Sequence, residues 1–376
     1  KKIRMDNVLQ INIFTEISNF SYGVYGKNIS LELNKHLEVC LAPSFHKLTG
    51  VEKLEFDEIQ KMLSRLEKMR FDNTGIIFSN GNQMFRFTGG KKIGFTFFFS
   101  DELENSWVNQ LKQLDIICVP SKWQAEILKK YDIKKIAVIQ PGVNLSIFKP
   151  RKQQSFEFTA KNKFKFFSIG KWDSRKNQQL TVESFCEEFS PEENVELYCM
   201  WHNPFMTGSF LPELLRFVTN KHKIYTKDQP EHSTIFIVNP VQSFHQLARI
   251  YNDMNCGIFP YKAEASGLRL LECMTTGMPC IATNYSMTTE FINEKNCYLL
   301  KNLETRPVKD DKSYAGLKGN WRIPEKKELR RIMREIFTNY KAAQIKGQTA
   351  AVEMKRFFWW NAANKLLNCV LSELKR

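Results

Sequence analysis

The sequence predicts an α/β fold made of two doubly wound domains, each a parallel sheet with helices on both faces, followed by a helical tail. The length of 376 residues exceeds one ordinary core and suits two domains of roughly 150 to 200 residues each. Short apolar runs alternate with stretches of helical spacing in two successive sets, which is typical of covered parallel sheets. Beyond residue 325 the pattern is helical, with no strand signal.

The first set of elements lies within residues 1–150. A glycine-containing turn follows its first strand and leads into its first helix. The predicted strands are 9–14, 37–42, 75–78, 93–99, 116–120 and 136–139, and the predicted helices are 23–36, 54–69 and 122–131. Residues 148–162 hold Pro150 and show little periodicity, which favours an interdomain linker.

The second set begins after this segment. The predicted strands are 164–169, 195–201, 235–238, 256–260 and 280–283, and the predicted helices are 177–189, 212–219, 244–253 and 268–276. We therefore expect domains over residues 1–150 and 151–356, with a terminal helix over 357–376.

Composition and charge limit the cellular compartment and the kinds of partner expected for the chain. Its nine cysteines are odd in number, lack C-x-x-C spacing and mostly lie in apolar runs, so we expect buried free thiols and a reducing, cytoplasmic location. No apolar run approaches the ~18 residues of a transmembrane helix, and the N-terminus lacks a signal-peptide pattern. The net charge of +15 favours an anionic partner: a nucleotide diphosphate, an acidic membrane face, an anionic polysaccharide or nucleic acid. A compositional bias toward lysine explains the same charge.

The most informative segment runs from Pro260 to Thr283. A small-residue turn follows a predicted strand and opens an amphipathic helix, which ends at Gly277. We call residues 260–267 the acid turn, because they contain Glu264. A turn that opens a helix presents free backbone N–H groups and suits a diphosphate, while Glu264 and Glu272 can accept hydrogen bonds from hydroxyl groups. The alternative is an ordinary strand–turn–helix unit with two surface glutamates.

This segment resembles the E-x7-E region of family 4 glycosyltransferases of the GT-B fold, commonly written E-G-F-G-L-x-x-L-E-A-M-A-x-G-x-P-V-I. The matching positions are Glu264, Gly267, Leu268, Leu271, Glu272, Met274, Gly277, Pro279 and Ile281. The departures are Ala265, Ser266 and residues 275–276, and none removes an acid or the glycine that opens the helix.

The resemblance implies roles for these positions. Glu272 would bind ribose hydroxyls, and Glu264 would face the transferred sugar. The backbone of the turn at Ser266, Gly267 and Leu268 would bind the donor, with the N–H groups of the last two on its diphosphate.

A second segment, which we call the cation turn, covers residues 171–177. Lys171, Arg175 and Lys176 follow a predicted strand within six residues, and preplaced cations stabilise charge on a departing diphosphate. Three exposed cations in a surface turn are the alternative. The segment resembles the family's G-R-x-x-x-x-K-G motif, with Lys171 in place of Arg and Asn177 in place of Gly. Because Arg is the better phosphate ligand, Arg175 is a second candidate for that role. We expect Lys176 to be a solvated side chain.

The resemblance extends over nearly the whole chain. Gly23 and Gly26 look like the first glycine loop of the family, which approaches the donor. Residues 115–124 and 138–150 look like its D-x-I-x-V-P-S-x-W and V-I-P-x-G-V-D runs, and residues 357–367 look like the closing helix. The implied fold is GT-B: two Rossmann-like domains facing across a cleft, with the C-terminal helix returning to the first domain.

The weakest catalytic candidate is Asp101, at the end of the strand predicted at 93–99. Members of the family often carry an acid at the position of Phe99, so we interpret Asp101 either as an acceptor-side residue or as a helix cap. The sequence shows no G-x-G-x-x-G, no D-x-D at a strand end, and six scattered histidines. We therefore expect no metal and no cofactor.

The resulting hypothesis is a metal-independent glycosyltransferase, and the resemblance implies that it retains the anomeric configuration. It would move a sugar, with a hexose as the first expectation, from a nucleotide-diphosphate donor to a glycan, lipid-linked or other hydroxyl acceptor. UDP is the expected nucleotide, polysaccharide biosynthesis the expected setting, and a peripheral contact with anionic membrane an expected partner. Two alternatives stay open: an enzyme that glycosylates DNA bases or other nucleic acid, for which no binding motif is visible, and a non-catalytic GT-B protein that binds a ligand or serves as a scaffold.

Overall fold

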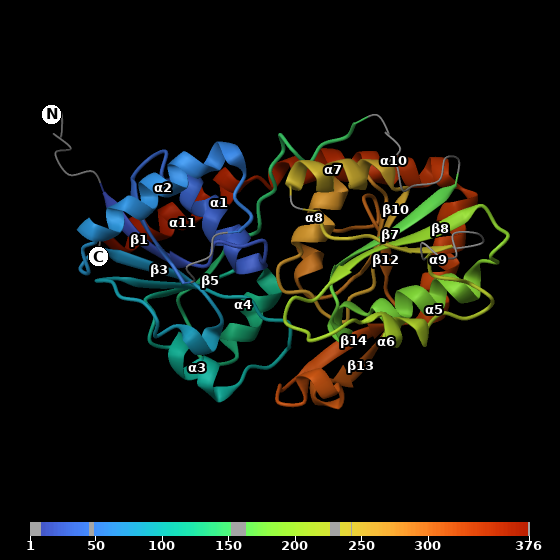
Figure 1. The fold of residues 1–376 in the computed structure, drawn as a ribbon. Helices are drawn as coiled ribbons and strands as arrows, with labels where there is room; N and C mark the ends of the chain where they lie inside the picture. Colours follow the sequence, from blue (N-terminus) through green and yellow to red (C-terminus); the bar gives the residue numbers. More distant parts are fainter. Residues whose placement is uncertain (1–8, 45–48, 152–162, 226–233, 242, 375–376) are drawn as a thin grey trace. The chain divides into compact units, whose positions relative to one another are not determined.

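The computed structural model describes residues 9–44, 49–151, 163–225, 234–241 and 243–374, and the chain divides into two compact units (Figure 1). The N-terminal unit comprises Lys1–Gly142 and Arg356–Arg376, and the C-terminal unit comprises Val143–Lys355. Residues 143–150, expected in the first domain, therefore belong to the second unit.

The N-terminal unit is built on a six-stranded sheet with the order β2-β1-β3-β4-β5-β6, in which all neighbours are parallel. The strands are β1 Gln10–Thr15, β2 Glu38–Pro43, β3 Thr74–Phe78, β4 Lys92–Phe95, β5 Ile116–Val119 and β6 Ile136–Val138. The central strands are buried on both faces because helices cover the sheet on either side, which explains their continuous apolar runs.

The helices of this unit include the one that closes the chain. They are α1 Ser21–Leu33, α2 Phe56–Ser64, α3 Asn105–Leu111, α4 Lys122–Lys129 and α11 Trp359–Leu374, with short 3-10 turns η1 Lys53–Glu55, η2 Arg65–Lys68 and η3 Gly81–Gln83. Helix α11 packs against α1 (Figure 1). The ring of Trp359 meets Tyr25 edge-on at 5.3 Å, and a Cβ at Gly142 would lie 2.5 Å from the Trp359 backbone. The last helix thus docks through a close contact that requires glycine at position 142.

The C-terminal unit holds a second six-stranded parallel sheet, ordered β12-β11-β10-β7-β8-β9. The strands are β7 Phe164–Lys171, β8 Val195–His202, β9 Ile235–Ile237, β10 Cys256–Phe259, β11 Cys280–Thr283 and β12 Tyr298–Leu300. The chain builds outward from β7 to β9, crosses back, and builds outward in the opposite direction from β10. The strand order therefore reverses between β7 and β10.

Helices and one hairpin complete this unit. The helices are α5 Gln178–Glu188, α6 Leu211–Leu215, α7 Phe244–Asp253, α8 Leu268–Thr275, α9 Lys326–Thr338 and α10 Tyr340–Glu353, with 3-10 turns η4 Ser174–Lys176, η5 Ser286–Glu290, η6 Val308–Asp310 and η7 Lys312–Tyr314. The 3-10 turn η8 Met354–Arg356 lies at the boundary between the units. The hairpin is antiparallel and consists of β13 Leu303–Pro307 and β14 Asn320–Pro324.

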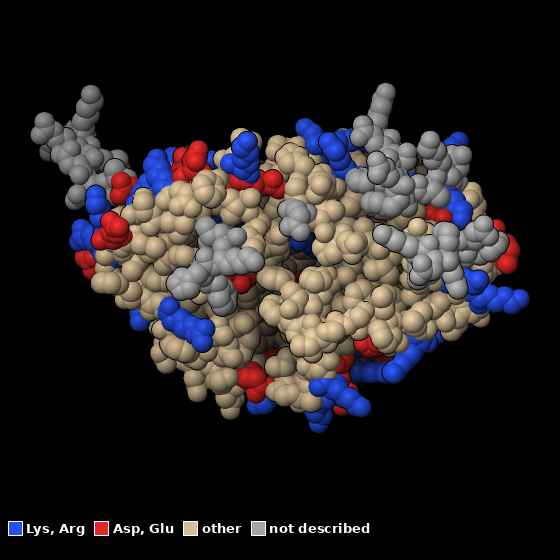
Figure 2. Space-filling view, viewed as in Figure 1, with Lys and Arg blue, Asp and Glu red and all other residues tan. Residues whose placement is uncertain are grey.

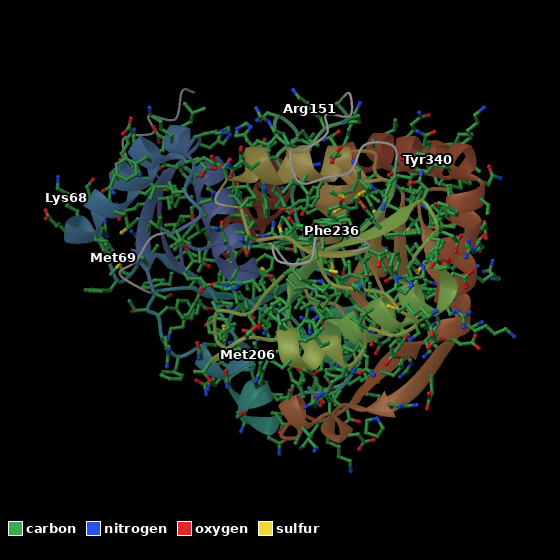
Figure 3. All side chains as sticks on the ribbon, turned by 45° about the vertical axis from the view of Figure 1, so that its right-hand side comes forward. Lys68, Met69, Arg151, Met206, Phe236 and Tyr340 are labelled. Carbon is green, nitrogen blue, oxygen red and sulfur yellow. The ribbon has the colours of Figure 1, made fainter. Side chains whose placement is uncertain are left out.

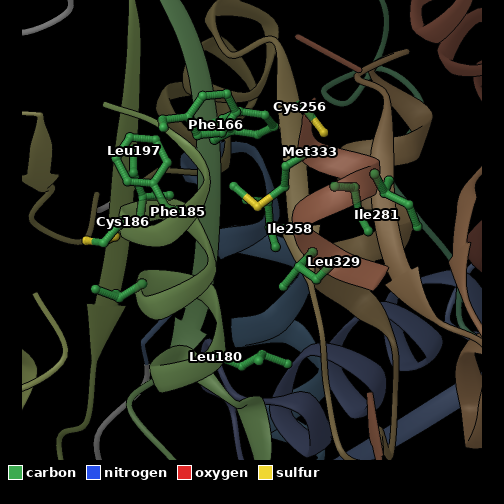
Figure 4. Close-up of a cluster of buried hydrophobic side chains, with 14 of the residues drawn as sticks. Phe166, Leu180, Phe185, Cys186, Leu197, Cys256, Ile258, Ile281, Leu329 and Met333 are labelled. Carbon is green, nitrogen blue, oxygen red and sulfur yellow. The ribbon is translucent and has the colours of Figure 1, made fainter. Parts of the chain in front are cut away.

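The core of the C-terminal unit lies between the sheet and helices α5 and α9 (Figure 4). Phe166 and Ile258 from the central strands pack there with Phe185 of α5 and Met333 of α9, all fully buried. Burial of each such side chain stabilises the fold by about 1.5–3 kcal/mol. On β8 and β9, Tyr198 stacks on Phe236 (labelled in Figure 3) with ring centroids 4.9 Å apart.

Several elements differ from the sequence predictions. Phe148, assigned to the linker, is a core residue: it is 3% exposed and packs against Phe244 and Tyr251. Residues 152–162, the rest of that segment, lie outside the described part of the chain. The helix predicted at 54–69 is divided into η1, α2 and η2, and strand β4 ends at Phe95 rather than Phe99. Strand β12 and the hairpin were not predicted.

Charged side chains are distributed without a dominant patch on the face in Figure 2. Acidic residues stand among the Lys and Arg on this face. Of the nine cysteines, all in described segments and all free, only Cys369 is more than slightly exposed. In the described segments, no helix combines the length and apolar character needed to cross a membrane.

Candidate functional site

The cation turn and the acid turn meet at the carboxyl ends of β7 and β10. These strands are neighbours in the sheet, with Cys256 paired to Phe166 and Gly257 to Phe167. The strand order reverses between them, and in open α/β sheets such a reversal leaves a crevice where ligands bind. The fold thus brings together two segments that are far apart in the sequence.

The cation turn is shaped by two residues that carry no positive charge. The carboxylate of Asp173 caps η4 by accepting a hydrogen bond of 3.0 Å from the Arg175 backbone N–H. Asn177 follows in a left-handed conformation (φ 60°, ψ 40°), which asparagine tolerates better than most residues. Its amide donates to the Pro260 carbonyl at 3.1 Å and so joins the two turns. Asn177 can therefore occupy a position where the related motif has glycine.

The acid turn enters α8 through Gly267, which also has a positive φ of 68°. A Cβ at this position would lie 2.9 Å from the ring of Phe291, so glycine is required both for conformation and for space. The backbone N–H of Glu264 donates to the hydroxyl of Ser286 at 2.8 Å. This hydrogen bond ties the acid turn to η5.

Glu264 is the point on which both turns converge. Its side chain is buried, and Oε2 accepts hydrogen bonds from Arg175 Nη1 at 3.2 Å and from Lys176 Nζ. Oε1 accepts from the backbone N–H groups of Ser266 at 3.1 Å and Gly267 at 3.2 Å. The carboxylate therefore lies between two cations and the amides that open α8.

Electrostatics at this cluster favour an ionised Glu264. Burial by itself raises the pKa of the Glu264 carboxyl, but the charges of Lys176 and Arg175 outweigh burial and hold that pKa below its usual range. Burial lowers the pKa of the Lys176 ammonium to about 8, against the opposing attraction of Glu264. The expectation of a solvated Lys176 is wrong: its side chain is 12% exposed and its Nζ lies 3.8 Å from the centroid of the Tyr261 ring.

Lys171 takes a different position from the other two cations. Its Nζ pairs with Asp173 Oδ2 at 2.9 Å, and its side chain is 37% exposed. Burial raises the pKa of the Asp173 carboxyl, yet Arg175 and Lys171 hold it down at about 2. Lys171 is connected to the cluster through Asp173, whereas Arg175 contacts Glu264 itself.

Glu272 lies in the middle of α8 and is also buried. Its Oε2 accepts from Arg269 Nη1 at 2.8 Å and from the Tyr251 hydroxyl at 3.2 Å. Burial raises the pKa of the Glu272 carboxyl, and the Arg269 charge opposes that rise. The acid that the sequence singled out for hydroxyl recognition is therefore braced by two partners from α7 and α8.

Two predicted residues lie in the N-terminal unit. Gly23 is in the first turn of α1, where its N–H donates to Glu16 Oε1 at 3.3 Å and a Cβ would lie 2.5 Å from the Ser18 backbone. Asp101 follows β4, but the residue that precedes α3 as its N-cap is Glu104. The helix-cap interpretation of Asp101 is therefore wrong, and its acceptor-side role stays a prediction.

Sequence inspection missed several members of the cluster. Asp173 and Arg269 carry a local signal, since each lies two or three residues from the group it contacts. Tyr251 and Tyr314 carry none, because their partners Glu272 and Asp173 are brought to them only by the fold. Within the described residues, no three His, Cys, Asp or Glu side chains gather where they could hold a metal ion.

Comparison with known families agrees with the resemblance seen in the motifs. Residues 163–307 match the family model described as Glycosyl transferases group 1. This match confirms the predicted likeness for the segment that contains both turns, while the roles assigned to Glu264 and Glu272 stay predictions.

One curated relative is a probable sucrose-phosphate synthase from Thermosipho melanesiensis, 23% identical over 250 residues that make up 64% of this chain. The chain spans about half the length of that relative, since the match covers 48% of it.

Solved structures share the fold along nearly the whole chain. A sucrose-phosphate synthase from Thermosynechococcus elongatus has a TM-score of 0.68 at 13% identity, covering 97% of this chain and 99% of the other. HepE from Anabaena, solved with UDP-glucose, has a TM-score of 0.64 at 12% identity, covering 97% of this chain and 100% of the other. The predicted GT-B fold, with two Rossmann-like sheets and their helices, is thus confirmed.

Proposed function

We propose that this chain, whose residues 163–307 match the group 1 glycosyl transferases, is a glycosyltransferase that uses a nucleotide-diphosphate sugar. The observation that carries the proposal is the convergence of Arg175 and Lys176 on Glu264 at the strand reversal of the C-terminal unit. A site with two fixed cations, helix-opening amides and a carboxylate offers complementary partners for a diphosphate and a sugar.

Each part of the donor has a proposed partner. Arg175, Lys176 and the amides at Gly267 and Leu268 bind the diphosphate, with Lys171 as an outer cation near it. Ser266 lines the same turn, and Glu264 orients the transferred sugar. Glu272 accepts hydrogen bonds from the ribose hydroxyls. Because Glu264 Oε1 accepts from the Ser266 and Gly267 N–H groups in this structure, donor binding shares or displaces those contacts.

The proposed reaction retains the anomeric configuration. The bond between the sugar C1 and the diphosphate oxygen breaks as the acceptor hydroxyl forms a new bond to C1 on the same face. The departing phosphate takes the hydroxyl proton. Arg175 and Lys176 stabilise the negative charge that grows on the diphosphate. Because these two side chains supply the positive charge, the proposed reaction uses no metal or other cofactor.

UDP is the proposed nucleotide and a hexose the proposed sugar. Support comes from HepE, which shares the fold and was solved with UDP-glucose. A panel of UDP-, GDP- and ADP-hexoses, scored for hydrolysis and for thermal stabilisation of the purified protein, tests this choice. Absence of stabilisation and hydrolysis with every donor would remove the enzymatic proposal and favour a scaffold.

The proposed acceptor is a glycan or a lipid-linked hydroxyl in cytoplasmic polysaccharide biosynthesis, reached by peripheral contact with anionic membrane. Support comes from the +15 charge and from the N-terminal unit, where Leu54 is 95% and Phe56 50% exposed beside Lys53. Flotation with liposomes containing or lacking anionic lipid tests the contact. Replacement of Leu54 and Phe56 by serine should reduce flotation, and equal recovery with both lipid mixtures would contradict the electrostatic part. Duplex DNA that competes with the liposomes would favour the nucleic-acid alternative.

A further inference from the structure

The hairpin segment, residues 303–324, reaches the cation turn through Tyr314. The Tyr314 hydroxyl lies 2.7 Å from Asp173 Oδ1 and 2.6 Å from Oδ2, across 141 residues of sequence. The same carboxylate accepts from the Arg175 backbone N–H and from Lys171 Nζ. Asp173 is therefore fixed from outside the cation turn by a neutral donor.

The hairpin segment also contacts the acid turn. Asp311 Oδ2 pairs with Lys262 Nζ at 3.3 Å, and the Arg322 backbone N–H donates to the Lys262 carbonyl at 3.0 Å. Lys262 in turn donates its own backbone N–H to the Arg175 carbonyl at 2.9 Å. One residue, two positions before Glu264, thus connects the hairpin segment, the acid turn and the cation turn.

An aromatic contact fixes the hairpin segment in this position. Trp321 is 2% exposed, and its ring meets Tyr314 edge-on with centroids 5.1 Å apart. The Lys262 ammonium lies 5.3 Å from the centroid of the same Trp321 ring. The tyrosine that reaches Asp173 is consequently held by packing as well as by its hydroxyl.

We propose that the hairpin segment is a brace for the donor site and that Tyr314 is a positioning residue that acts on the cation turn through Asp173 and through its hydroxyl contact with the Arg175 side chain. The family match ends at residue 307, so nearly all of the brace lies beyond it. The Asp173 carboxylate already accepts hydrogen bonds from Tyr314 and Lys171. It therefore does not need the Arg175 guanidinium as a further donor, and that guanidinium stays on Glu264. The cation turn is then held in the conformation in which Arg175 and Lys176 both contact Glu264.

This inference rests on the proposed glycosyl transfer for its kinetic consequence but not for its structural one. Tyr314→Phe removes the hydroxyl and keeps the ring on Trp321. Tyr198→Phe is the matched control, because its hydroxyl also donates to a carboxylate, Glu196 at 2.7 Å, near the amino end of β8. Both variants, with the wild type, are measured by hydrogen–deuterium exchange without ligand, by UDP titration, and by donor turnover.

We expect Tyr314→Phe to increase deuterium uptake over residues 172–178 and to lower turnover about tenfold, the effect of losing one charge-assisted hydrogen bond. UDP affinity should change by less than about threefold, because Arg175, Lys176 and the amides remain. The Tyr198→Phe control should change neither the deuterium uptake over residues 172–178 nor the turnover. Asp311→Asn, which keeps Tyr314 and removes the charge facing Lys262, should raise uptake over residues 260–267.

Unchanged uptake over residues 172–178 in Tyr314→Phe overturns the brace whatever the activity. If wild type binds no UDP and turns over no donor, the proposed function fails, while the exchange measurement still decides the brace. Equal loss in Tyr314→Phe and the Tyr198→Phe control would mark a general structural effect and overturn the positioning role.

Discussion

The ammonium group of Lys176 donates a hydrogen bond to the carboxylate of Glu264, which follows it by 88 residues in the sequence. Arg175 contacts the same oxygen at 3.2 Å. The site therefore contains its own anion, and in the proposed reaction an incoming diphosphate would compete with Glu264 for the two cations. Removing a cation and removing the carboxylate should consequently affect binding in opposite directions.

Replacing Lys176 by methionine should lower turnover by at least about a hundredfold, or roughly 2.7 kcal/mol, since the diphosphate gains charge on reaching the transition state. UDP affinity should fall less, because Arg175 and the α8 amides remain. Folding should survive, since Glu264 keeps Arg175 and two backbone N–H groups. Steady-state kinetics and a melting curve measure turnover and folding. Lys171→Met, which removes the more exposed outer cation, should lower turnover less than Lys176→Met does. Near-normal turnover would remove Lys176 from the catalytic role.

The activity of the free enzyme should fall as pH rises through about 8. Burial lowers the pKa of Lys176 to about 8, so the cation is present below that pH and is lost above it. We expect an alkaline limb in a profile of kcat/KM against pH. In Lys176→Arg, whose guanidinium stays charged, this limb should move to higher pH or disappear. A limb at the same pH in both proteins would assign it to another group.

Glu264→Gln should bind UDP more tightly and turn over donor more slowly. Loss of the negative charge leaves Arg175 and Lys176 without their shared counter-ion, so UDP affinity should rise at least about threefold. Turnover should fall about a hundredfold as the sugar loses its partner. The empty variant should melt earlier, because breaking a buried ion pair costs about 3–5 kcal/mol. Calorimetric titration and thermal shift with UDP measure these effects, and weaker UDP binding would contradict the competition.

Glu272→Gln should weaken UDP binding by about 1.5–3 kcal/mol while leaving turnover at saturating donor largely intact. Glutamine keeps the shape of the side chain beside Arg269 and Tyr251, so the loss reports on the charge that accepts the ribose hydroxyls. Comparison of UDP with 2′-deoxy-UDP provides the control: the variant should discriminate between them less than the wild type does. An unchanged UDP dissociation constant would exclude the ribose role.

The sequence was sufficient for the parts of the fold that local patterns determine. Strand β11 and helix α7 occupy Cys280–Thr283 and Phe244–Asp253, as their apolar runs and helical spacing predict. Strands in this sheet are covered on both faces, so their residues form continuous apolar runs that stand out from the flanking turns. The helix-opening glycine at position 267 was visible for a similar reason, because the positive φ that opens α8 belongs to the local turn.

The parts that were missed depend on contacts between distant segments. Strand β13 has four exposed residues and an apolar content too low to mark it, since it pairs only with β14. Phe148 lies between Pro141 and Pro150 in a segment that was expected to be a linker, yet it is buried by Phe244 and Tyr251 from a helix about a hundred residues further on. Lys176 was expected in solvent, because nothing in its local sequence reveals that Tyr261 and Glu264 cover it.

The order of strands in the C-terminal unit has a consequence for the growing chain. The two cations are synthesised with β7, but their counter-ion follows β10, after β8, β9 and α7 have been made. Closing so long a loop costs conformational entropy before the contact repays it, so the pairing of Glu264 with Arg175 and Lys176 should be a late step of folding. A nascent chain that ends before β10 carries Arg175 and Lys176 without Glu264, the counter-ion with which they pair in the complete fold. Competence to hold a donor should therefore appear abruptly, with the docking of β10, rather than grow as successive strands are added.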